Sequence, residues 1–380
     1  MKKTIVGLLC LVFISVFILT SCNQASQDVI KIGAIMPVTG PVAIYGTQSR
    51  NAIKMAEEEI NQKGILGGKK IKIIVEDDEA NPEKTLNAFS KLVTKEKVIA
   101  VIGALTSKCS VPLSKEAQKR KILMITPTST NDDVTKAGDL IFRACYKDSI
   151  QAPVIAQFAY EKLNAKNAAV MFDSSNDYSV GMKDNFIKKF EQLGGKIVAS
   201  EAYGKDDTDF SAQLTKIKGT KPDVIFLPDY YSKVALIAKQ VRQQGIDVPM
   251  LGGDGWDEIT SQAGDEVIGC YYTNHYSPDA DDAEVKDFVK KYKEKYNEVP
   301  NALAALAYDS TYILAEAIDR AGSTKSDDIK KAMMQTDKKY VTGHIKFDEE
   351  RNPIKPLTLI KIVKGQDGKL ATEFAGTVNP

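Results

Sequence analysis

The chain has 380 residues and a formal net charge of +1 at pH 7, with 27% charged and 43% hydrophobic residues. This balance is typical of a globular protein, and the length allows two domains of ordinary size. There is no basic excess of the kind that indicates nucleic-acid binding and no acidic run typical of a solvating tail, so no nucleic-acid partner is expected.

The N-terminal segment has the composition of an export signal. Lys2 and Lys3 precede an uncharged apolar stretch at residues 5–19. This stretch is shorter than the roughly 20 residues that a membrane-spanning helix needs, and it has the proportions of a signal-peptide core. It ends in Leu19-Thr20-Ser21-Cys22, which resembles the lipobox of bacterial lipoproteins.

From this pattern we expect a signal peptide at residues 1–21, a lipid on the thiol of Cys22 and a short polar tether at residues 22–28. The protein would then be exported and lipid-anchored on the outer face of the cytoplasmic membrane or in the periplasm. An uncleaved anchor, or a plain secretory signal with an incidental cysteine, is the alternative.

The cysteines that follow Cys22 do not have the spacing of metal ligands. They are Cys109, Cys145 and Cys270, and the chain has only two histidines. We therefore expect no metal site, and buried free thiols at these three positions. One disulfide remains possible outside the cell.

Beyond residue 28, short strand-like runs alternate with amphipathic helical stretches. Strands are predicted at residues 29–36, 71–76, 98–102, 122–125, 168–172, 196–200, 224–227 and 249–252. Helices are predicted at residues 47–62, 83–94, 178–192 and 233–243, followed by a helical block at 283–335. This alternation predicts an α/β fold with parallel sheets that are covered by helices on both faces.

The number of strands favours two doubly wound parallel-sheet lobes over one large sheet. We expect three chain crossings between the lobes, near residues 143–153, 271–278 and 352–356, and hence a hinge with one dominant motion. The predicted lobes are residues 29–145 with 275–352, and residues 146–274 with 353–380.

Five segments together resemble the leucine/isoleucine/valine-binding proteins, which have the type I periplasmic-binding-protein fold. These segments are Gly40-Pro41-Val42-Ala43-Ile44-Tyr45-Gly46, Glu76-Asp77-Asp78, Val101-Ile102-Gly103-Ala104-Leu105-Thr106-Ser107, Leu123-Met124-Ile125-Thr126-Pro127-Thr128-Ser129-Thr130 and Gly252-Gly253-Asp254-Gly255-Trp256. The resemblance implies a monomer without a cofactor that captures a small amino acid and delivers it to the permease of an ABC importer. The family's cysteine near residues 79–82 is missing here, so its usual disulfide in the first lobe cannot form.

Two hydroxyl residues follow predicted buried strands and are candidates for binding a carboxylate. Ser107 and Thr130 lie just past their strands, where ligands bind in open parallel sheets. The resemblance implies that both hold the ligand carboxylate, and that the Thr128 carbonyl and the Thr130 hydroxyl face its ammonium group. On spacing alone, Ser107 and Thr130 would instead be N-caps of the next helices.

Asp254 is the candidate partner of the ammonium group. It follows an apolar strand and lies between glycines, which allow a close approach of the backbone to a ligand. The family has an acidic residue here, usually Glu, that pairs with the ligand ammonium. A turn-forming Asp is the alternative, since Asp-Gly is a common turn pair.

Aromatic and aliphatic residues would complete the site by resemblance. Three tyrosines would cover the ligand, namely Tyr45, Tyr178 and Tyr230. The side-chain pocket would be lined by Leu105, Thr106 and Leu303. The family often has an aromatic residue near Leu303, so this chain should have a roomier, aliphatic pocket. Ordinary packing at a lobe surface is the alternative for each tyrosine.

Other classes of protein are less well supported by the sequence. The motifs of serine hydrolases, zinc peptidases, P-loop proteins and dinucleotide-binding enzymes are not found in it. An enzyme is therefore not expected, and no catalytic residue is predicted. A sensory ligand-binding domain of the same fold, and a protein that binds urea or a short amide, remain as alternatives.

Overall fold

The apolar runs of the first lobe form a parallel sheet. The computed structural model describes residues 29–378. The sheet has the order β2-β1-β3-β4-β5 and all its neighbouring strands are parallel. Its strands are β1 (Val29–Met36), β2 (Lys70–Asp77), β3 (Ala100–Gly103), β4 (Leu123–Thr126) and β5 (Ile141–Arg143). The central strands β3 and β4 are buried throughout, because helices cover both faces of the sheet.

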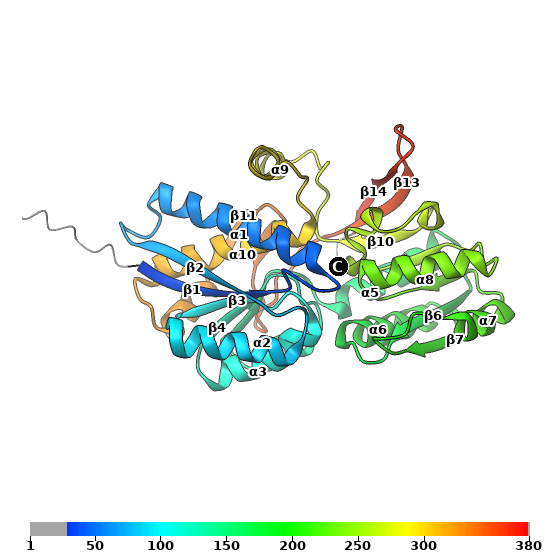
Figure 1. The fold of residues 1–380 in the computed structure, drawn as a ribbon, viewed down its shortest axis with the longest axis horizontal. Coiled ribbons are helices and arrows are strands. Elements are labelled where there is room, and N and C mark those ends of the chain that lie inside the picture. The colour runs from blue at the N-terminus through cyan, green and yellow to red at the C-terminus, as the bar shows by residue number, and fades with distance from the viewer. Residues whose placement is uncertain (1–28, 379–380) are drawn as a thin grey trace, which may run out of the picture.

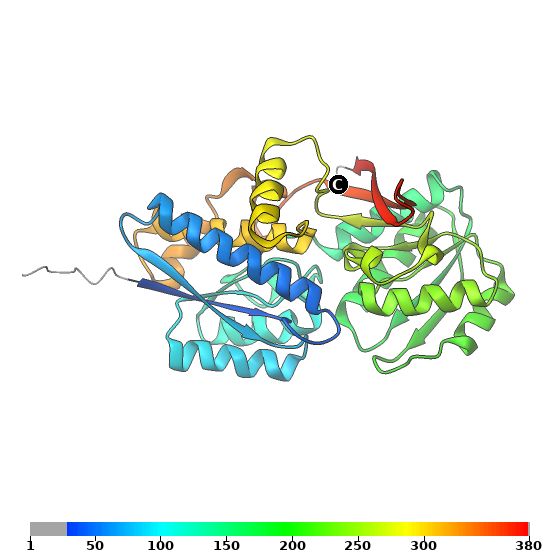
Figure 2. The ribbon, with the colours of Figure 1, turned by 45° about the horizontal axis from the view of Figure 1, so that its top comes forward.

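Alternate residues of each central strand face different helices. Ile102 and Ile125 pack in the cluster that contains α1 and α10. Val101 and Met124 pack on the opposite face, in the cluster that contains residues of α2 and α3. Figures 1 and 2 show the arrangement of these helices around the sheet. The helices of this lobe are α1 (Ala43–Lys63), α2 (Pro82–Lys91) with a π-helical extension (Leu92–Glu96), α3 (Ser107–Lys119), α4 (Asp133–Lys136), α9 (Ala283–Tyr296), α10 (Ala302–Ala321) and α11 (Ser326–Met333).

The helix ends in this lobe follow from local sequence chemistry. The Asn81 side chain accepts hydrogen bonds from the N–H groups of Glu83 and Lys84, and Pro82 occupies the first turn of α2. The Asn301 side chain caps α10 in the same way through the N–H of Ala304. The first turn of α10 lies beside the second lobe, since the Ala302 N–H donates to Asp257 Oδ2.

The second lobe repeats this arrangement and adds two strands. Its sheet has the order β14-β13-β10-β9-β8-β6-β7. Strands β6 to β10 run parallel, β13 is antiparallel to β10, and β14 is antiparallel to β13. The strands are β6 (Asn167–Asp173), β7 (Lys196–Tyr203), β8 (Val224–Phe226), β9 (Met250–Gly252), β10 (Tyr271–Asn274), β13 (Leu357–Lys364) and β14 (Leu370–Val378). The chain returns from the first lobe at the end where β10 finishes, so β13 must run in the opposite direction.

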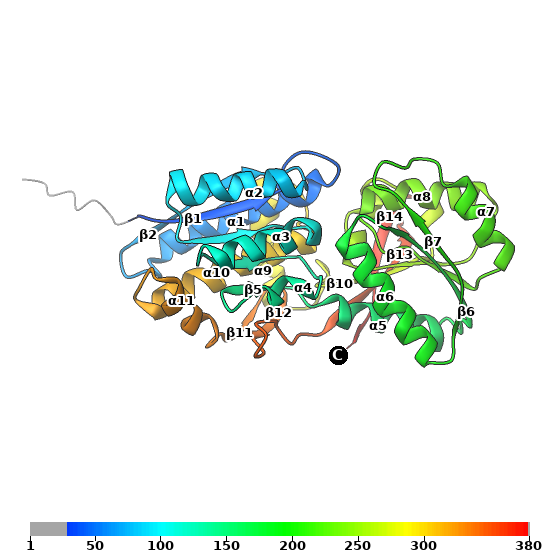
Figure 3. The same ribbon diagram turned by 90° about the horizontal axis from the view of Figure 1, so that it is seen from below.

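Helices cover both faces of this sheet as well (Figure 3). Phe226 packs with α5 and α6, and its neighbour Ile225 packs with α7 and α8. The helices are α5 (Asp148–Glu161), α6 (Asp177–Gln192), α7 (Ser211–Thr220) and α8 (Tyr231–Gln243), with short 3-10 turns η2 (Asp254–Trp256), η3 (Ile259–Ser261) and η4 (Asp265–Val267). The predicted α/β class with two doubly wound lobes is confirmed.

Some elements differ from the sequence prediction. The expected crossing at 143–153 is wrong in its second half, because α5 begins at Asp148 and includes Pro153. Since proline removes only one helical hydrogen bond here, near the start of the helix, α5 continues through it. The block at 283–335 is three helices, and an unexpected hairpin of β11 (Asp337–Tyr340) and β12 (Gly343–Lys346) follows it.

The thiol prediction for the described part of the chain is confirmed, since Cys109, Cys145 and Cys270 are all buried and free. The predicted signal peptide, Cys22 and the tether lie outside the described residues. Among residues 29–378, no helix has both the length and the apolar character needed to cross a membrane.

The start of α1 provides a test of packing, because Gly46 lies against the loop after β1. A Cβ atom on Gly46 would lie 2.0 Å from the Pro37 carbonyl oxygen, whereas one on Gly219 in α7 would have no atom within 4 Å. Gly46→Ala should lower the free energy of unfolding by about 1–3 kcal/mol through overpacking. Gly219→Ala should be neutral or slightly stabilising, because alanine favours helices. Thermal unfolding of both variants measures the difference, and equal melting temperatures would contradict this packing.

Candidate functional site

A cavity between the two lobes brings the predicted ligand-binding residues together. Its lining consists of all ten residues predicted from the sequence, together with Gly255: Tyr45, Leu105, Thr106, Ser107, Thr128, Thr130, Tyr178, Tyr230, Asp254, Gly255 and Leu303. All ten predicted residues therefore line a single cavity.

The topology of the sheets explains why these residues meet. In both lobes the first parallel strand has neighbours on both sides, and the strand order reverses there. Ligands bind at such switch points, outside the carboxyl ends of the strands. The cavity residues follow the carboxyl ends of β1, β3 and β4 in the first lobe and of β6, β8 and β9 in the second. Leu303 alone comes from another place, the first turn of α10.

Hydrogen bonds fix the loops after β3 and β4 against each other. The Thr128 hydroxyl donates to the Leu105 carbonyl at 2.6 Å, and the Asn131 N–H donates to Ser107 Oγ at 3.2 Å. Behind them the buried Arg143 guanidinium donates to two carbonyls of the loop after β4, those of Ser129 and Asn131. The loop that carries Thr128 and Thr130 is thus held by side chains of the lobe interior.

The start of α3 lies at the cavity, where Thr106 and Ser107 are among the lining residues. The N-cap of α3 is Thr106 and that of α4 is Asp132, so the N-cap alternative for Ser107 and Thr130 is wrong. Within the described residues, no acceptor is assigned to the N–H groups of Ser107 and Lys108, as expected for a first helical turn. Free N–H groups and the helix dipole favour an anion at this position.

The three tyrosines form one aromatic group that spans the cleft, with Tyr45 from the first lobe and Tyr178 and Tyr230 from the second. The rings of Tyr178 and Tyr230 stack with centroids 5.2 Å apart, and Tyr45 meets Tyr230 edge-on at 6.2 Å. Burial raises the pKa of each of the three hydroxyls well above its ordinary value, so they remain neutral. The group therefore provides apolar area together with uncharged hydroxyls.

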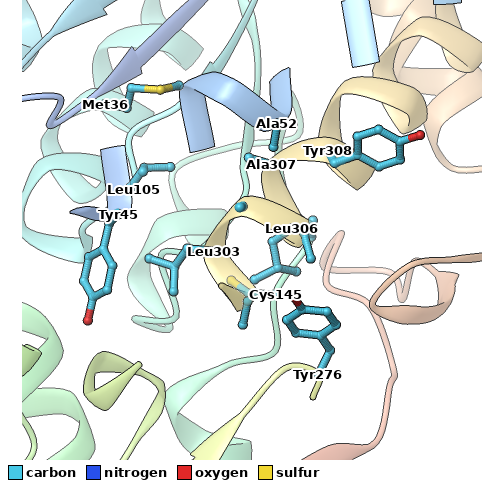
Figure 4. Close-up of a cluster of buried hydrophobic side chains, with 14 of the residues drawn as sticks. Met36, Tyr45, Ala52, Leu105, Cys145, Tyr276, Leu303, Leu306, Ala307 and Tyr308 are labelled. Atoms are coloured by element: carbon cyan, nitrogen blue, oxygen red, sulfur yellow. The ribbon is translucent and has the colours of Figure 1, made fainter. Parts of the chain in front are cut away.

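The apolar wall of the cavity comes from the first lobe. Figure 4 shows Leu105, Leu303 and Tyr45 together at the edge of the main hydrophobic cluster. Leu105 and Leu303 are 3% and 5% exposed, so this wall excludes water. Two branched aliphatic side chains on one wall favour an aliphatic group on the ligand.

Asp254 provides the negative charge of the cavity. It begins η2 directly after β9 and is 5% exposed. Two side chains hydrogen-bond to its carboxylate. Gln151 Nε2 lies 2.9 Å from Oδ1, and His275 Nε2 lies 3.1 Å from Oδ2. Among the lining residues of the described chain, Asp254 is the only one with a formal charge. The glycines beside it are required here, because a Cβ on Gly253 or Gly255 would collide with the Tyr178 side chain.

Sequence reasoning missed several residues that shape the site. Gly255 was part of a recognised motif, and its place beside Asp254 was the available signal. Gln151 was missed because residues 143–153 were predicted as a crossing and not as a helix. His275 and Asp257 had no sequence pattern that connects them with Asp254.

Hydrogen bonds across the cleft hold the two lobes together on both sides of the cavity. On one side the Tyr45 hydroxyl donates to the Gly255 carbonyl at 2.7 Å, and the Ala302 N–H at the start of α10 donates to Asp257 Oδ2 at 2.7 Å. On the other side Asn131 Nδ2 donates to the Asp177 carbonyl at 2.8 Å. The structure is therefore a closed arrangement of the lobes.

The site has the chemistry to hold a small zwitterion. One buried carboxylate lines the cavity together with the hydroxyls of serine, threonine and tyrosine residues, and none of the lining side chains is cationic. Within residues 29–378, no group of three or more His, Cys, Asp or Glu side chains is arranged to hold a metal ion.

The two-lobed fold with a cavity between its lobes is the type I periplasmic-binding-protein fold. A family model described as Periplasmic binding protein matches residues 29–368, and the chain belongs to this family. The resemblance indicated by the sequence motifs is thereby confirmed.

Individual relatives agree with this assignment. The chain is 32% identical over 353 residues to Leu/Ile/Val-binding protein homolog 1 of Brucella abortus (strain 2308), a match that covers 91% of this chain and 94% of that protein. A leucine binding protein from Thermotoga maritima has a TM-score of 0.87 at 35% identity, covering 92% of this chain and 99% of the other. A branched-chain amino acid transporter substrate binding protein from Streptococcus pneumoniae, solved in complex with isoleucine, has a TM-score of 0.85 at 35% identity, covering 93% and 100%.

Asp257 should make the stability of the closed protein depend on pH. Burial raises the pKa of its carboxyl group to about 7, and the charge of Glu258 adds to the shift. Between its ordinary pKa and 7, the folded state holds a proton that the unfolded state does not, so stability falls as the pH rises. Asp257→Asn is always neutral. The melting temperature of wild type relative to Asp257→Asn should therefore decrease from pH 5 to pH 8.

The matched control for this measurement is Asp209→Asn. Hydrogen bonds from Ser211 lower the pKa of the Asp209 carboxyl, so this group stays ionised from pH 5 to pH 8. The difference between wild type and Asp209→Asn should therefore be constant over this range. A constant difference for Asp257→Asn as well would show that its carboxylate is not stabilised in the protonated form.

Proposed function

We propose that this protein is the extracytoplasmic solute-binding component of an ABC importer, and that it captures an aliphatic, branched-chain amino acid between its lobes and delivers it to the permease. The observation that carries the proposal is the single buried carboxylate of Asp254 at a closed cavity whose other polar side chains are uncharged. The names of the relatives, which refer to leucine, isoleucine and valine, support the same ligand class.

The charges of an amino acid fit this division of the cavity. The ammonium group would pair with Asp254, the Thr128 carbonyl and the Thr130 hydroxyl. The carboxylate would accept hydrogen bonds from Ser107 and Thr130 and lie at the start of α3, where the helix dipole favours an anion. A buried charge without such partners would be strongly destabilising, so a ligand with one charge fits less well.

The ligand side chain would lie against Leu105, Thr106 and Leu303, under the tyrosines. Burying a branched aliphatic side chain contributes roughly 1.5–3 kcal/mol, which is enough to separate leucine from glycine by about tenfold or more. Urea or a short amide is the second candidate from the sequence. Neither carries an ammonium group, so Asp254 would be left without a cationic partner.

The proposed location follows from the N-terminal segment. We infer that the precursor is exported, that its signal peptide is removed before Cys22, and that a lipid on this cysteine anchors a monomer near its permease. An anchor at the end of a short tether would keep the binding lobes close to the membrane. As a binding protein it would carry no catalytic residue and need no cofactor.

Isothermal titration tests the ligand class. Leucine, isoleucine and valine should bind ahead of glycine, glutamate, lysine and urea, and ahead of 4-methyl-2-oxopentanoate, which is leucine with its amino group replaced by a carbonyl. Asp254→Ala should weaken leucine binding by about 2–5 kcal/mol, because the ammonium loses its buried partner. Binding of urea ahead of every aliphatic amino acid, or leucine binding by Asp254→Ala within threefold of wild type, would contradict the proposed site.

Cys22→Ala tests the anchor in cells. Without its thiol, the chain cannot carry the lipid, so the variant should be released from the membrane fraction or remain as an uncleaved precursor. Fractionation with immunoblotting, and mass spectrometry of the wild-type N-terminus, measure both properties. A variant that is processed and retained like wild type would show that Cys22 is not the lipidation site.

A further inference from the structure

We propose that Gln151 and His275, which do not line the cavity, are positioning residues that hold the Asp254 carboxylate against the ligand and so determine the preference for a ligand with an amino group. This inference rests on the proposed function, and it names the residues that give the site its selectivity for an ammonium group.

Gln151 holds both the backbone and the side chain of Asp254. Its Nε2 donates to Asp254 Oδ1 at 2.9 Å and to Asp148 Oδ1 at 3.0 Å. Its Oε1 accepts from the Asp254 N–H at 3.3 Å and from the Thr273 hydroxyl at 2.9 Å. All four hydrogen-bonding positions of the amide are thus used, and the amide has only one orientation that satisfies them. Gln151 is fully buried on α5, so its own position is fixed.

His275 holds the second oxygen of the same carboxylate. Its Nε2 lies 3.1 Å from Asp254 Oδ2, and its ring stacks on Tyr146 with centroids 3.9 Å apart. Burial lowers the pKa of the imidazole, which favours its neutral form. Because an ionised carboxylate only accepts hydrogen bonds, the single proton must be on Nε2. This agrees with Nδ1, which is buried and has no hydrogen-bond partner among the described residues.

Both donors are therefore uncharged, which determines the charge that the ligand meets at Asp254. They bond to both oxygens of Asp254 without neutralising its charge, so the negative charge remains available for an ammonium group. The neighbouring carboxyl of Asp148 does not add a competing charge easily, because burial raises its pKa well above the ordinary value. A cationic partner in place of either donor would compete with the ligand.

Among residues 29–378, the side-chain hydrogen bonds to the Asp254 carboxylate come from Gln151 and His275 alone. Gly253 and Gly255 beside Asp254 have no side chains, and the segment is a single 3-10 turn. Gln151 is 103 residues away along the chain and His275 is 21 residues away. The direction of the carboxylate therefore depends on α5 and on the end of β10.

The test compares leucine with 4-methyl-2-oxopentanoate in variants that fold. Gln151→Met and His275→Phe keep the size of each side chain and remove the donors. Since hydrogen bonds to a charged group are among the strong ones, each variant should lose roughly 10- to 100-fold in leucine affinity. The affinity for the 2-oxo acid should change by less than about threefold. His275→Gln, whose amide nitrogen can replace Nε2, should recover most of the loss.

Matched controls are Gln157→Met on the exposed face of α5 and His344→Phe, the only other histidine. Neither should change the ratio of the two affinities. Equal losses for both ligands, or no loss for leucine, would overturn the positioning role. If Gln151→Met does not fold, the two His275 variants decide the question alone. A wild-type protein that binds no amino acid would instead overturn the proposed function, and this inference with it.

Discussion

The direction of the parallel strands is the constraint on which the whole structure depends. In both lobes the carboxyl ends of the parallel strands face the same cleft, so the loops after β1, β3 and β4 meet those after β6, β8 and β9. Loops at these ends begin helices or tight turns, and their free N–H groups and short polar side chains point into the cleft. One geometric rule thus supplies most of the cavity lining.

Closing the cleft removes its charged groups from water, which is unfavourable unless each charge is hydrogen-bonded or paired. The surrounding groups supply these partners. Arg143 is buried behind the loop after β4 and bonds to carbonyl oxygens there, while Asp254 is bonded by two neutral donors. Asp257 is bonded by the first N–H of α10 across the cleft. The cavity therefore keeps one unneutralised carboxylate, and the lobes are joined by hydrogen bonds that exist only when they meet.

Much of the site could be predicted because its residues follow recognisable strands. Ser107 and Thr130 come directly after continuous apolar runs, and Asp254 follows another run between glycines. Leu303 could be named only through family resemblance, since its helix comes from a distant part of the chain. Gln151 was missed because residues 143–153 were predicted as a crossing, whereas α5 begins at Asp148. The direction of β13 and β14 depends on the end at which the chain re-enters the second lobe, and this cannot be predicted from a local sequence pattern.

The sequence by itself determined the alternation of strands and helices, the two-lobed α/β class and the residues at the strand ends, because these depend on local periodicity and on the fixed direction of parallel strands. Only the tertiary structure decided which distant groups meet, such as Gln151 and His275 with Asp254, and which are removed from water. The pKa of about 7 at Asp257 is an example, since it arises from burial between two lobes. Contact and burial depend on how the lobes pack together, and this packing cannot be inferred from the residues of a single chain segment.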